Sequence, residues 1–164
     1  MSTDRKKQKT PAAGPAQEGE MIWNRLKHFN KNERWGDPWR MNGLLLLLTD
    51  AIRDEMGAKF IIHFGNAGKH ISGSQHYPGN AEDGHFETDI SYYSQILRLE
   101  NVLKGLQVES RVGLGLYPVW LHPGFHLDVR GFRARWGWIG ELNPDGSKKY
   151  CSYERAKAFA EAMK

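Results

Sequence analysis

Apolar side chains recur at helical spacing in two stretches of the chain, which predicts two helices. The first follows Asp37-Pro38, a dipeptide typical of a helix N-cap with proline at the first helical position, and Gly57 is its expected stop. Its apolar positions are Leu44, Leu45, Leu48, Ile52 and Met56. The second, over about residues 89–104, is apolar at Tyr92, Ile96, Leu99, Leu103 and Leu106. A closing helix rich in alanine and charge is predicted over residues 152–163.

Three short runs predict strands. Residues 60–64 are mostly apolar, residues 111–117 alternate with glycine, and residues 125–130 alternate between apolar and polar side chains. A loop at residues 65–80 contains three glycines, Pro78 and Gly79, and loops this long are usually functional or disordered. We therefore predict one α+β domain over residues 21–164, a small antiparallel sheet flanked by helices. Phe29, Trp35 and Trp39 are its expected N-terminal anchors.

Composition narrows the class of protein. The chain has 164 residues, 40% of them hydrophobic, which suits one domain with its own core. Residues 1–20 have no apolar periodicity and are predicted to form a disordered basic tail. The longest apolar run, residues 44–48, is far shorter than the ~20 residues of a membrane span, so no membrane insertion is expected. No apolar signal segment is visible, which predicts a protein that is cytoplasmic at synthesis.

A formal net charge of +4 favours anionic partners such as nucleic acid, anionic lipid or a cell-wall polymer. A basic cluster in the tail suggests a nucleic-acid arm, but acidic residues dilute it and no nucleic-acid-binding motif is present. We expect no nucleic-acid partner and a monomeric chain. The single cysteine, Cys151, excludes an internal disulfide and is expected to be inert.

The first candidate constellation is His76 and Asp83, seven residues apart across a turn that Pro78 and Gly79 can make. Such a turn lets an imidazole and a carboxylate converge on one ion, and both are good zinc ligands. A surface histidine and a turn aspartate would give the same pattern without any metal.

The second constellation is the alternating run at residues 125–130. Because strand side chains alternate, His126, Asp128 and Arg130 share one face, opposite Phe125 and Leu127. The polar face is suited to line a cleft. An ordinary amphipathic strand with a solvated row of ion pairs explains the alternation equally well.

Together the two segments resemble a known family. The run Ser74-x-His76-x-x-Gly79-x-Ala81-x-Asp83 is similar to the metal signature of the D-alanyl-D-alanine carboxypeptidase family of zinc peptidases, and residues 124–131 are similar to its second metal segment. The family includes peptidoglycan carboxypeptidases and endopeptidases, and hedgehog signalling domains share its metal fold. The resemblance covers roughly residues 25–140. It implies that His76, Asp83 and His126 hold Zn²⁺, with water in the fourth position.

The chain departs from the family's pattern in two places. Members often carry a carboxylate three positions before the last zinc histidine, where this chain has Pro123. Asp128 and His122 are therefore the candidates for the catalytic base, and Asp128 could equally orient a ligand.

Relatives also carry Ser-Gly-Tyr-Arg where this chain has residues 64–67, Phe-Gly-Asn-Ala, so the substrate-facing arginine is missing. Either Lys69 or Arg130 substitutes for it or substrate binding is altered, and Ser74 is expected beside them in substrate binding.

Other polar and aromatic residues are weaker candidates for the metal site or its surroundings. His85 and Glu87 follow Asp83 at strand alternation and offer an alternative ligand, although a solvated strand edge is the favoured interpretation. His63 is expected to pack and His70 to lie on the loop surface. Trp136 and Trp138 form either a wall of the cleft or part of the core, and the core is the favoured interpretation. Tyr117 is expected to end a strand near the metal.

The resemblance predicts a zinc-dependent peptidase that hydrolyses peptidoglycan stem peptides or cross-links. Such a protein could be a phage-type lysin that acts on the cell wall after release, and its positive charge suits a carboxylate-bearing polymer. The alternative is a non-catalytic, zinc-containing wall-binding module on the same fold, which the missing arginine and missing upstream base favour.

Overall fold

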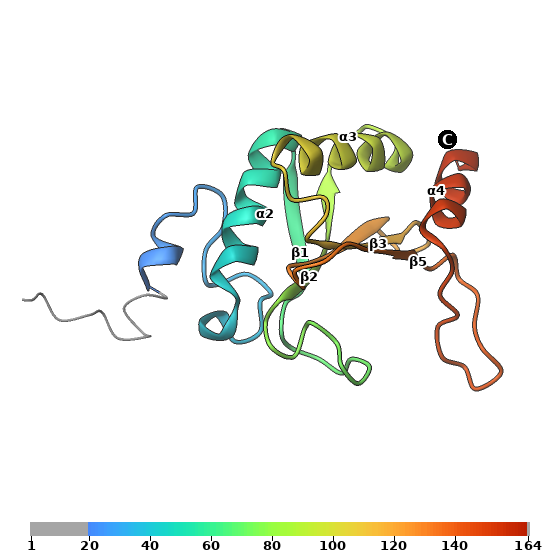
Figure 1. Cartoon of the computed structure of the whole chain (residues 1–164), viewed down its shortest axis with the longest axis horizontal. Coiled ribbons are helices and arrows are strands. Elements are labelled where there is room, and N and C mark those ends of the chain that lie inside the picture. The colour runs from blue at the N-terminus through green and yellow to red at the C-terminus, as the bar shows by residue number, and fades with distance from the viewer. Residues whose placement is uncertain (1–19, 164) are drawn as a thin grey trace, which may run out of the picture.

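The computed structural model describes residues 20–163. The predicted basic tail, residues 1–20, therefore lies outside the described residues apart from Glu20. The elements in chain order are the 3-10 helix η1 (Pro38–Arg40), α2 (Gly43–Met56), β1 (Lys59–Phe64), β2 (Ala81–Glu87), α3 (Tyr92–Gly105), β3 (Gly113–Tyr117), β4 (Gly124–Asp128), β5 (Ala134–Gly137) and α4 (Tyr153–Ala162) (Figure 1). The α+β class is confirmed. Within residues 20–163 no helix is long and apolar enough to cross a membrane.

The ends of the helices follow from their capping residues. Asp37 does cap a helix that starts with proline, but this helix is the short η1, and α2 has its own cap in Asn42, which accepts a hydrogen bond from the Leu44 N–H. Gly57 ends α2 in the left-handed conformation (φ 61°), as predicted. Ser91 caps α3, which begins three residues later than the predicted start at residue 89.

The five strands form one sheet in the order β1-β2-β4-β3-β5. The pairs β1–β2, β2–β4 and β4–β3 are antiparallel, but β5 runs parallel to β3, so the prediction of an antiparallel sheet is wrong for β5. The reason is the connection at residues 129–133, which crosses the end of β3. Gly113 consequently pairs with Asp128 on one side and with Ala134 on the other.

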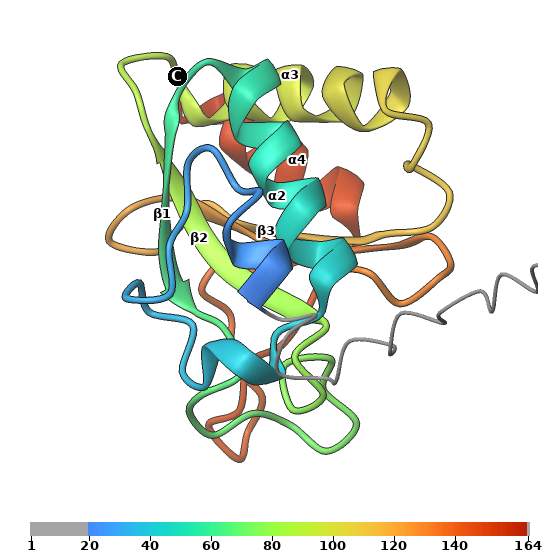
Figure 2. The ribbon, with the colours of Figure 1, turned by 90° about the vertical axis from the view of Figure 1, so that its left-hand side faces the viewer.

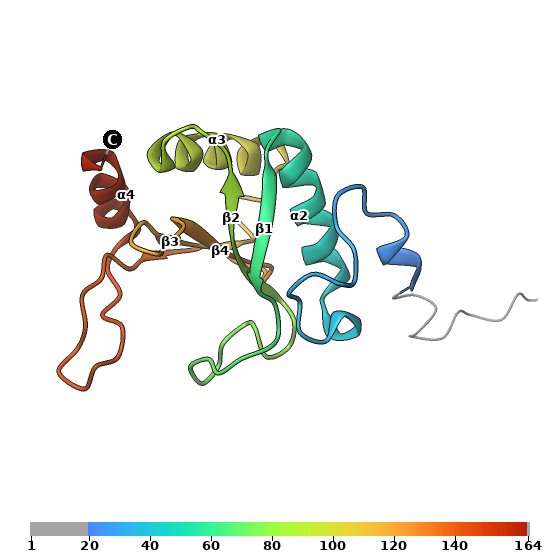
Figure 3. The ribbon, with the colours of Figure 1, turned by 180° about the vertical axis from the view of Figure 1, so that it is seen from behind.

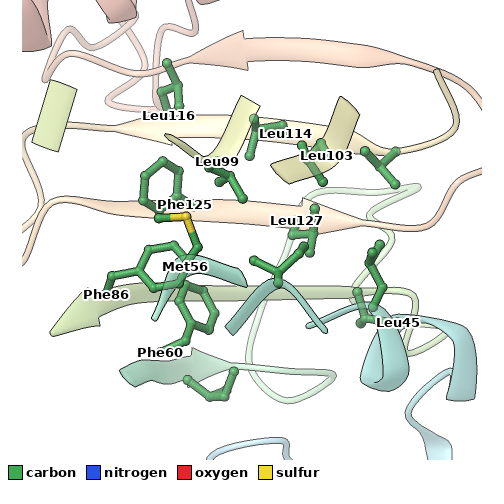
Figure 4. Packing of buried hydrophobic residues seen from close by; sticks show 14 of the residues in the cluster. Leu45, Met56, Phe60, Phe86, Leu99, Leu103, Leu114, Leu116, Phe125 and Leu127 are labelled. Carbon is green, nitrogen blue, oxygen red and sulfur yellow. The ribbon is translucent and has the colours of Figure 1, made fainter. Parts of the chain in front are cut away.

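The core lies between the sheet and the helices (Figure 4). Phe125 and Leu127 point from β4 into it, as their alternation with His126 and Asp128 predicted, and Leu114 and Leu116 of β3 lie beside them. Figures 2 and 3 both show α2 alongside β1 and β2. Figure 1 shows α4 next to β5, and α3 packs between α2 and α4. The apolar face of the sheet is thus covered by helices, which leaves the other face for the polar side chains.

Residues 20–42 pack beside α2 (Figure 3). The buried Asp50 carboxylate accepts hydrogen bonds from the backbone N–H groups of Lys27 and His28, both at 2.9 Å. Trp35 is fully buried, and its ring lies 5.6 Å from that of Phe29. Both were predicted anchors. Trp39 is not one, because it is 51% exposed.

Candidate metal centre

Two paired strands and one loop bring the three predicted ligands together. Asp83 of β2 lies directly opposite His126 of β4 in the antiparallel register, so both side chains leave the same face of the sheet. His76 reaches them from the 65–80 loop. Gly79 fixes the end of that loop: its φ is +78°, its carbonyl accepts a hydrogen bond from the Asn42 N–H, and an added Cβ would overlap the backbone carbonyl of Arg40.

The candidate ligand atoms converge on one point. His126 Nδ1 lies 2.9 Å from Asp83 Oδ1, His76 Nε2 lies 3.2 Å from His126 Nδ1, and His76 Nε2 lies 3.4 Å from Asp83 Oδ1. Among residues 20–163, these are the three side chains whose ligand atoms all lie within 4.8 Å of one another. The prediction that they come together is confirmed. Two imidazole nitrogens and one carboxylate oxygen are a donor set that suits a divalent transition metal.

Hydrogen bonds behind the ligands fix how they face the centre. His76 Nδ1 donates to the Gly65 carbonyl at 2.6 Å, which leaves the lone pair of Nε2 facing the other two ligands. His126 Nε2 donates to Asp128 Oδ2 at 2.9 Å, which likewise leaves Nδ1 for an ion. Carboxylate and carbonyl partners of this kind are what metal-binding histidines ordinarily have.

The pKa values of His126 and Asp83 are set by each other and by the charged groups beside them. Burial lowers the pKa of His126, but its hydrogen bonds to Asp128 and Asp83 outweigh burial and raise that pKa to about 9. Burial would raise the pKa of Asp83, yet the two imidazoles hold it well below its usual range. The raised pKa favours the imidazolium form of His126 in the metal-free protein, and a metal ion that binds Nδ1 must displace the proton there.

Asp128 is a predicted catalytic residue, and the structure places it behind His126. It is 0% exposed and does not line the cavity described below. Arg130 donates to its Oδ1 through Nε at 2.7 Å and through the backbone N–H at 3.2 Å. Gly113 leaves room for the carboxylate, because an added Cβ there would overlap it. This position favours the role of orienting His126 over that of a base.

A cavity of about 600 Å³ opens over the three candidate ligands. It lies between the 65–80 loop and the connection from β5 to α4, and Figures 1 and 3 show these two segments projecting on the same side of the sheet, away from α3 and α4. The three predicted substrate-binding residues, Ser74, Lys69 and Arg130, all line it. Ser74 Oγ also accepts a hydrogen bond from the His76 backbone N–H at 3.3 Å, which ties the loop to the ligand.

One wall of the cavity is aromatic. The rings of Tyr117 and Trp120 stack with centroids 4.1 Å apart, and Trp136 Nε1 donates to the Tyr117 hydroxyl at 3.2 Å. Tyr117 thus lies near the centre, as expected. The expectation that Trp136 and Trp138 belong to the core is wrong: both are half-buried, because β5 is an edge strand, and Trp136 lies 5.0 Å from the His126 ring.

Sequence reasoning missed Lys148 and undervalued His70. Lys148 Nζ lies 5.1–5.7 Å from the centroids of three aromatic rings and lines the cavity. No local signal marks it, since it lies beyond residues 25–140, the segment that carries the resemblance. His70 is not simply a surface residue: its ring stacks on that of His76 at 4.1 Å, with an interplanar angle of 7°.

The remaining predicted histidines lie apart from the three ligands. His122, the other candidate base, does not line the cavity and stacks on His85 at a centroid distance of 4.7 Å. His85 in turn contacts His63 of β1, which is half-buried rather than packed in the core. Glu87 is exposed and pairs with Lys59 at 3.4 Å.

On the opposite face of β2, Glu82 is fully buried against α2. Burial raises the pKa of Glu82 to about 8, and a hydrogen bond to Thr49 only partly offsets this effect. The Thr49 hydroxyl has one hydrogen but lies 2.9 Å from the Leu45 carbonyl and 2.5 Å from Glu82 Oε1. Both contacts are hydrogen bonds only if Glu82 is protonated. Its position next to Asp83, a candidate ligand on the other face, is the sequence signal that predicts this burial.

No protein-family model, curated protein or solved structure matches the chain. Any proposal of function therefore rests on the sequence motifs and the geometry of the site.

Proposed function

We propose that the protein is a Zn²⁺-dependent peptidase that hydrolyses peptidoglycan stem peptides or their cross-links. The observation that carries this proposal is the convergence of His76, Asp83 and His126 at the floor of an open cavity. Three protein ligands with an accessible fourth side are the arrangement of catalytic zinc sites, whereas structural sites are closed by four protein ligands. The donor set fits zinc, which when bound would supply a water of lowered pKa and polarise a carbonyl.

The chain's own residues supply orientation and charge. Asp128 holds the His126 ring and Gly65 holds the His76 ring, so neither ligand needs to reorganise. Lys69 and Lys148 lie on the two sides of the cavity, and Asp83 is the only carboxylate among its described lining residues. This balance favours a substrate that carries carboxylates, as peptidoglycan peptides do. A lysin that meets the cell wall after release is the setting that we propose for it.

A second candidate function is a non-catalytic, zinc-containing module that binds the cell wall. The observation that favours it is the position of the two predicted bases. Asp128 lies behind His126 and His122 lies outside the cavity, so neither faces the place where a substrate would bind. This module would use the same cavity and the same cations.

Digestion of purified muropeptides distinguishes the two functions. Zinc-loaded wild-type protein is incubated with monomeric and cross-linked muropeptides, and the products are identified by mass spectrometry. We expect new peptide products with wild type and with the control His28→Gln, whose imidazole contacts Asp54 far from the cavity, and none with His76→Ala. Binding of muropeptides without any product from wild type would refute the peptidase and leave the binding module.

A further inference from the structure

Three histidines that are not metal-centre ligands meet on the same face of the sheet. His63 lies near the end of β1, His85 on β2, and His122 in the turn before β4. His63 Nε2 lies 2.7 Å from His85 Nδ1. The His122 ring stacks on that of His85, with centroids 4.7 Å apart and an interplanar angle of 13°.

The strands hold two of these rings in place. The ladder between β1 and β2 is irregular between Ile62 and Phe64, so His63 has no residue paired with it in the register. Irregularities of this kind bend a strand and re-aim a side chain, and they are frequent near functional sites. Here the irregular residue is the one whose imidazole meets His85.

The distance between the His63 and His85 ring nitrogens is close to the distance between the two histidine nitrogens in the metal centre. Two imidazole nitrogens bound to one tetrahedral metal at ~2.0–2.1 Å are separated by roughly 3.3 Å. The His76–His126 nitrogens are 3.2 Å apart and the His63–His85 nitrogens are 2.7 Å apart. A side-chain rotation that opens the second pair by roughly 0.6 Å would therefore admit an ion.

His122 can supply a third nitrogen. It is exposed, and within residues 20–163 it makes no hydrogen bond or ion pair, so its ring is free to turn from the stack toward the other two. Its parallel orientation does not point its nitrogens at the same ion as His85 does, and binding therefore requires this rotation. The exposure of His122 also leaves the ion accessible to water as a fourth ligand.

We propose that His63, His85 and His122 form a second transition-metal site, separate from the His76–Asp83–His126 centre. His63 and His85 are its strand-held ligands and His122 is its adjustable ligand. A site of imidazoles takes Zn²⁺, Ni²⁺ or Cu²⁺ and discriminates against Mg²⁺ and Ca²⁺, which prefer oxygen ligands. This site does not depend on the peptidase proposal, because it requires no substrate and no turnover.

Occupancy of the site would act on one wall of the cavity. The Trp120 ring lies 5.9 Å from His63 and stacks on Tyr117, which lines the cavity. Trp120 and His122 belong to the same turn, so an ion that fixes His122 also restrains Trp120. Tryptophan fluorescence is therefore a second readout, and paramagnetic Cu²⁺ or Ni²⁺ is the suitable probe.

The test counts metal ions on protein without a histidine tag. Zn²⁺ and Ni²⁺ are measured by equilibrium dialysis and metal analysis for wild type, the double variant His63→Gln/His85→Gln, His122→Ala and the control His28→Gln. Far-UV circular dichroism checks that each variant folds. We expect the double variant to bind one Zn²⁺ fewer per chain than wild type and the control, whether or not the first centre is filled. Mg²⁺ should not bind at this site.

The His122→Ala variant changes an exposed side chain, so it keeps the test decisive if the double variant fails to fold. We expect it to weaken one Zn²⁺ by ~10-fold or more, at least the loss seen when a partner of a metal ligand is removed. Its Ni²⁺-dependent quenching of tryptophan fluorescence should weaken in parallel. A double variant that binds as many ions as wild type, or a His122→Ala variant with unchanged affinity for every ion, would overturn the proposal.

Discussion

Replacing Asp128 by asparagine tests how the metal centre is oriented. The Asp128 carboxylate is fully buried, accepts the hydrogen bond of His126 Nε2, and pairs with Arg130. The asparagine side chain would keep the shape and could still accept one hydrogen bond from His126. Its NH₂ group, however, would face the Arg130 donors, and the negative charge that balances both cations would be lost.

The expected loss follows from these contacts. Removing the partner of a metal-bound histidine typically weakens metal affinity by ~10- to 100-fold, which corresponds to about 1.4–2.7 kcal/mol. We place Asp128→Asn at the upper end, because Asp128 is buried and partners two cationic groups at once. Hydrolysis of muropeptides should fall by a similar or larger factor, since a misoriented His126 would also misplace the ion.

Zinc affinity is measured by competition with a chromogenic chelator. The His63→Gln/His85→Gln background restricts the titration to one site, and Asp89→Asn is the control because Asp89 is exposed. Unchanged zinc affinity together with lost hydrolysis would show that Asp128 acts as the base and does not orient His126. Unchanged affinity and unchanged hydrolysis would remove Asp128 from the site.

Three further predictions follow from single contacts. Gly113→Ala should lower zinc affinity as Asp128→Asn does and destabilise the fold by ~1–3 kcal/mol in thermal unfolding, because its Cβ would overlap the Asp128 carboxylate; an unchanged melting temperature and affinity would contradict this. Glu82→Gln should flatten the pH dependence of urea unfolding in metal-free protein. The folded pKa of Glu82 is raised to about 8 from 4.5, so wild type loses roughly 1 kcal/mol per pH unit as pH rises between these values; equal slopes in the two proteins would refute a protonated Glu82. Lys148→Met should raise KM for carboxylate-bearing muropeptides several-fold and leave zinc affinity unchanged, because Lys148 lines the cavity without contacting a ligand; an unchanged KM would exclude it from substrate binding.

The parts of the site that sequence reasoning found are those encoded locally. The turn after His76 and the alternation around His126 are readable from spacing, and a single pairing, Asp83 opposite His126, joins them. Burial of the β4 apolar face and the glycine stop of α2 were predictable for the same reason.

The parts that it missed depend on contacts between distant segments. The direction of β5 depends on a connection that crosses β3, which no local pattern specifies. Lys148 reaches the cavity only because the 138–152 connection folds back over the sheet. The meeting of His63 with His85 likewise requires the irregular β1–β2 register.

Crystals grown with Zn²⁺ and measured at the zinc absorption edge would test the metal centre most directly. We predict an anomalous difference peak ~2.0–2.2 Å from His76 Nε2, His126 Nδ1 and an Asp83 carboxylate oxygen. A triad without a peak, with the His76–His126 contact of 3.2 Å retained, would contradict the assignment of these residues as the zinc site.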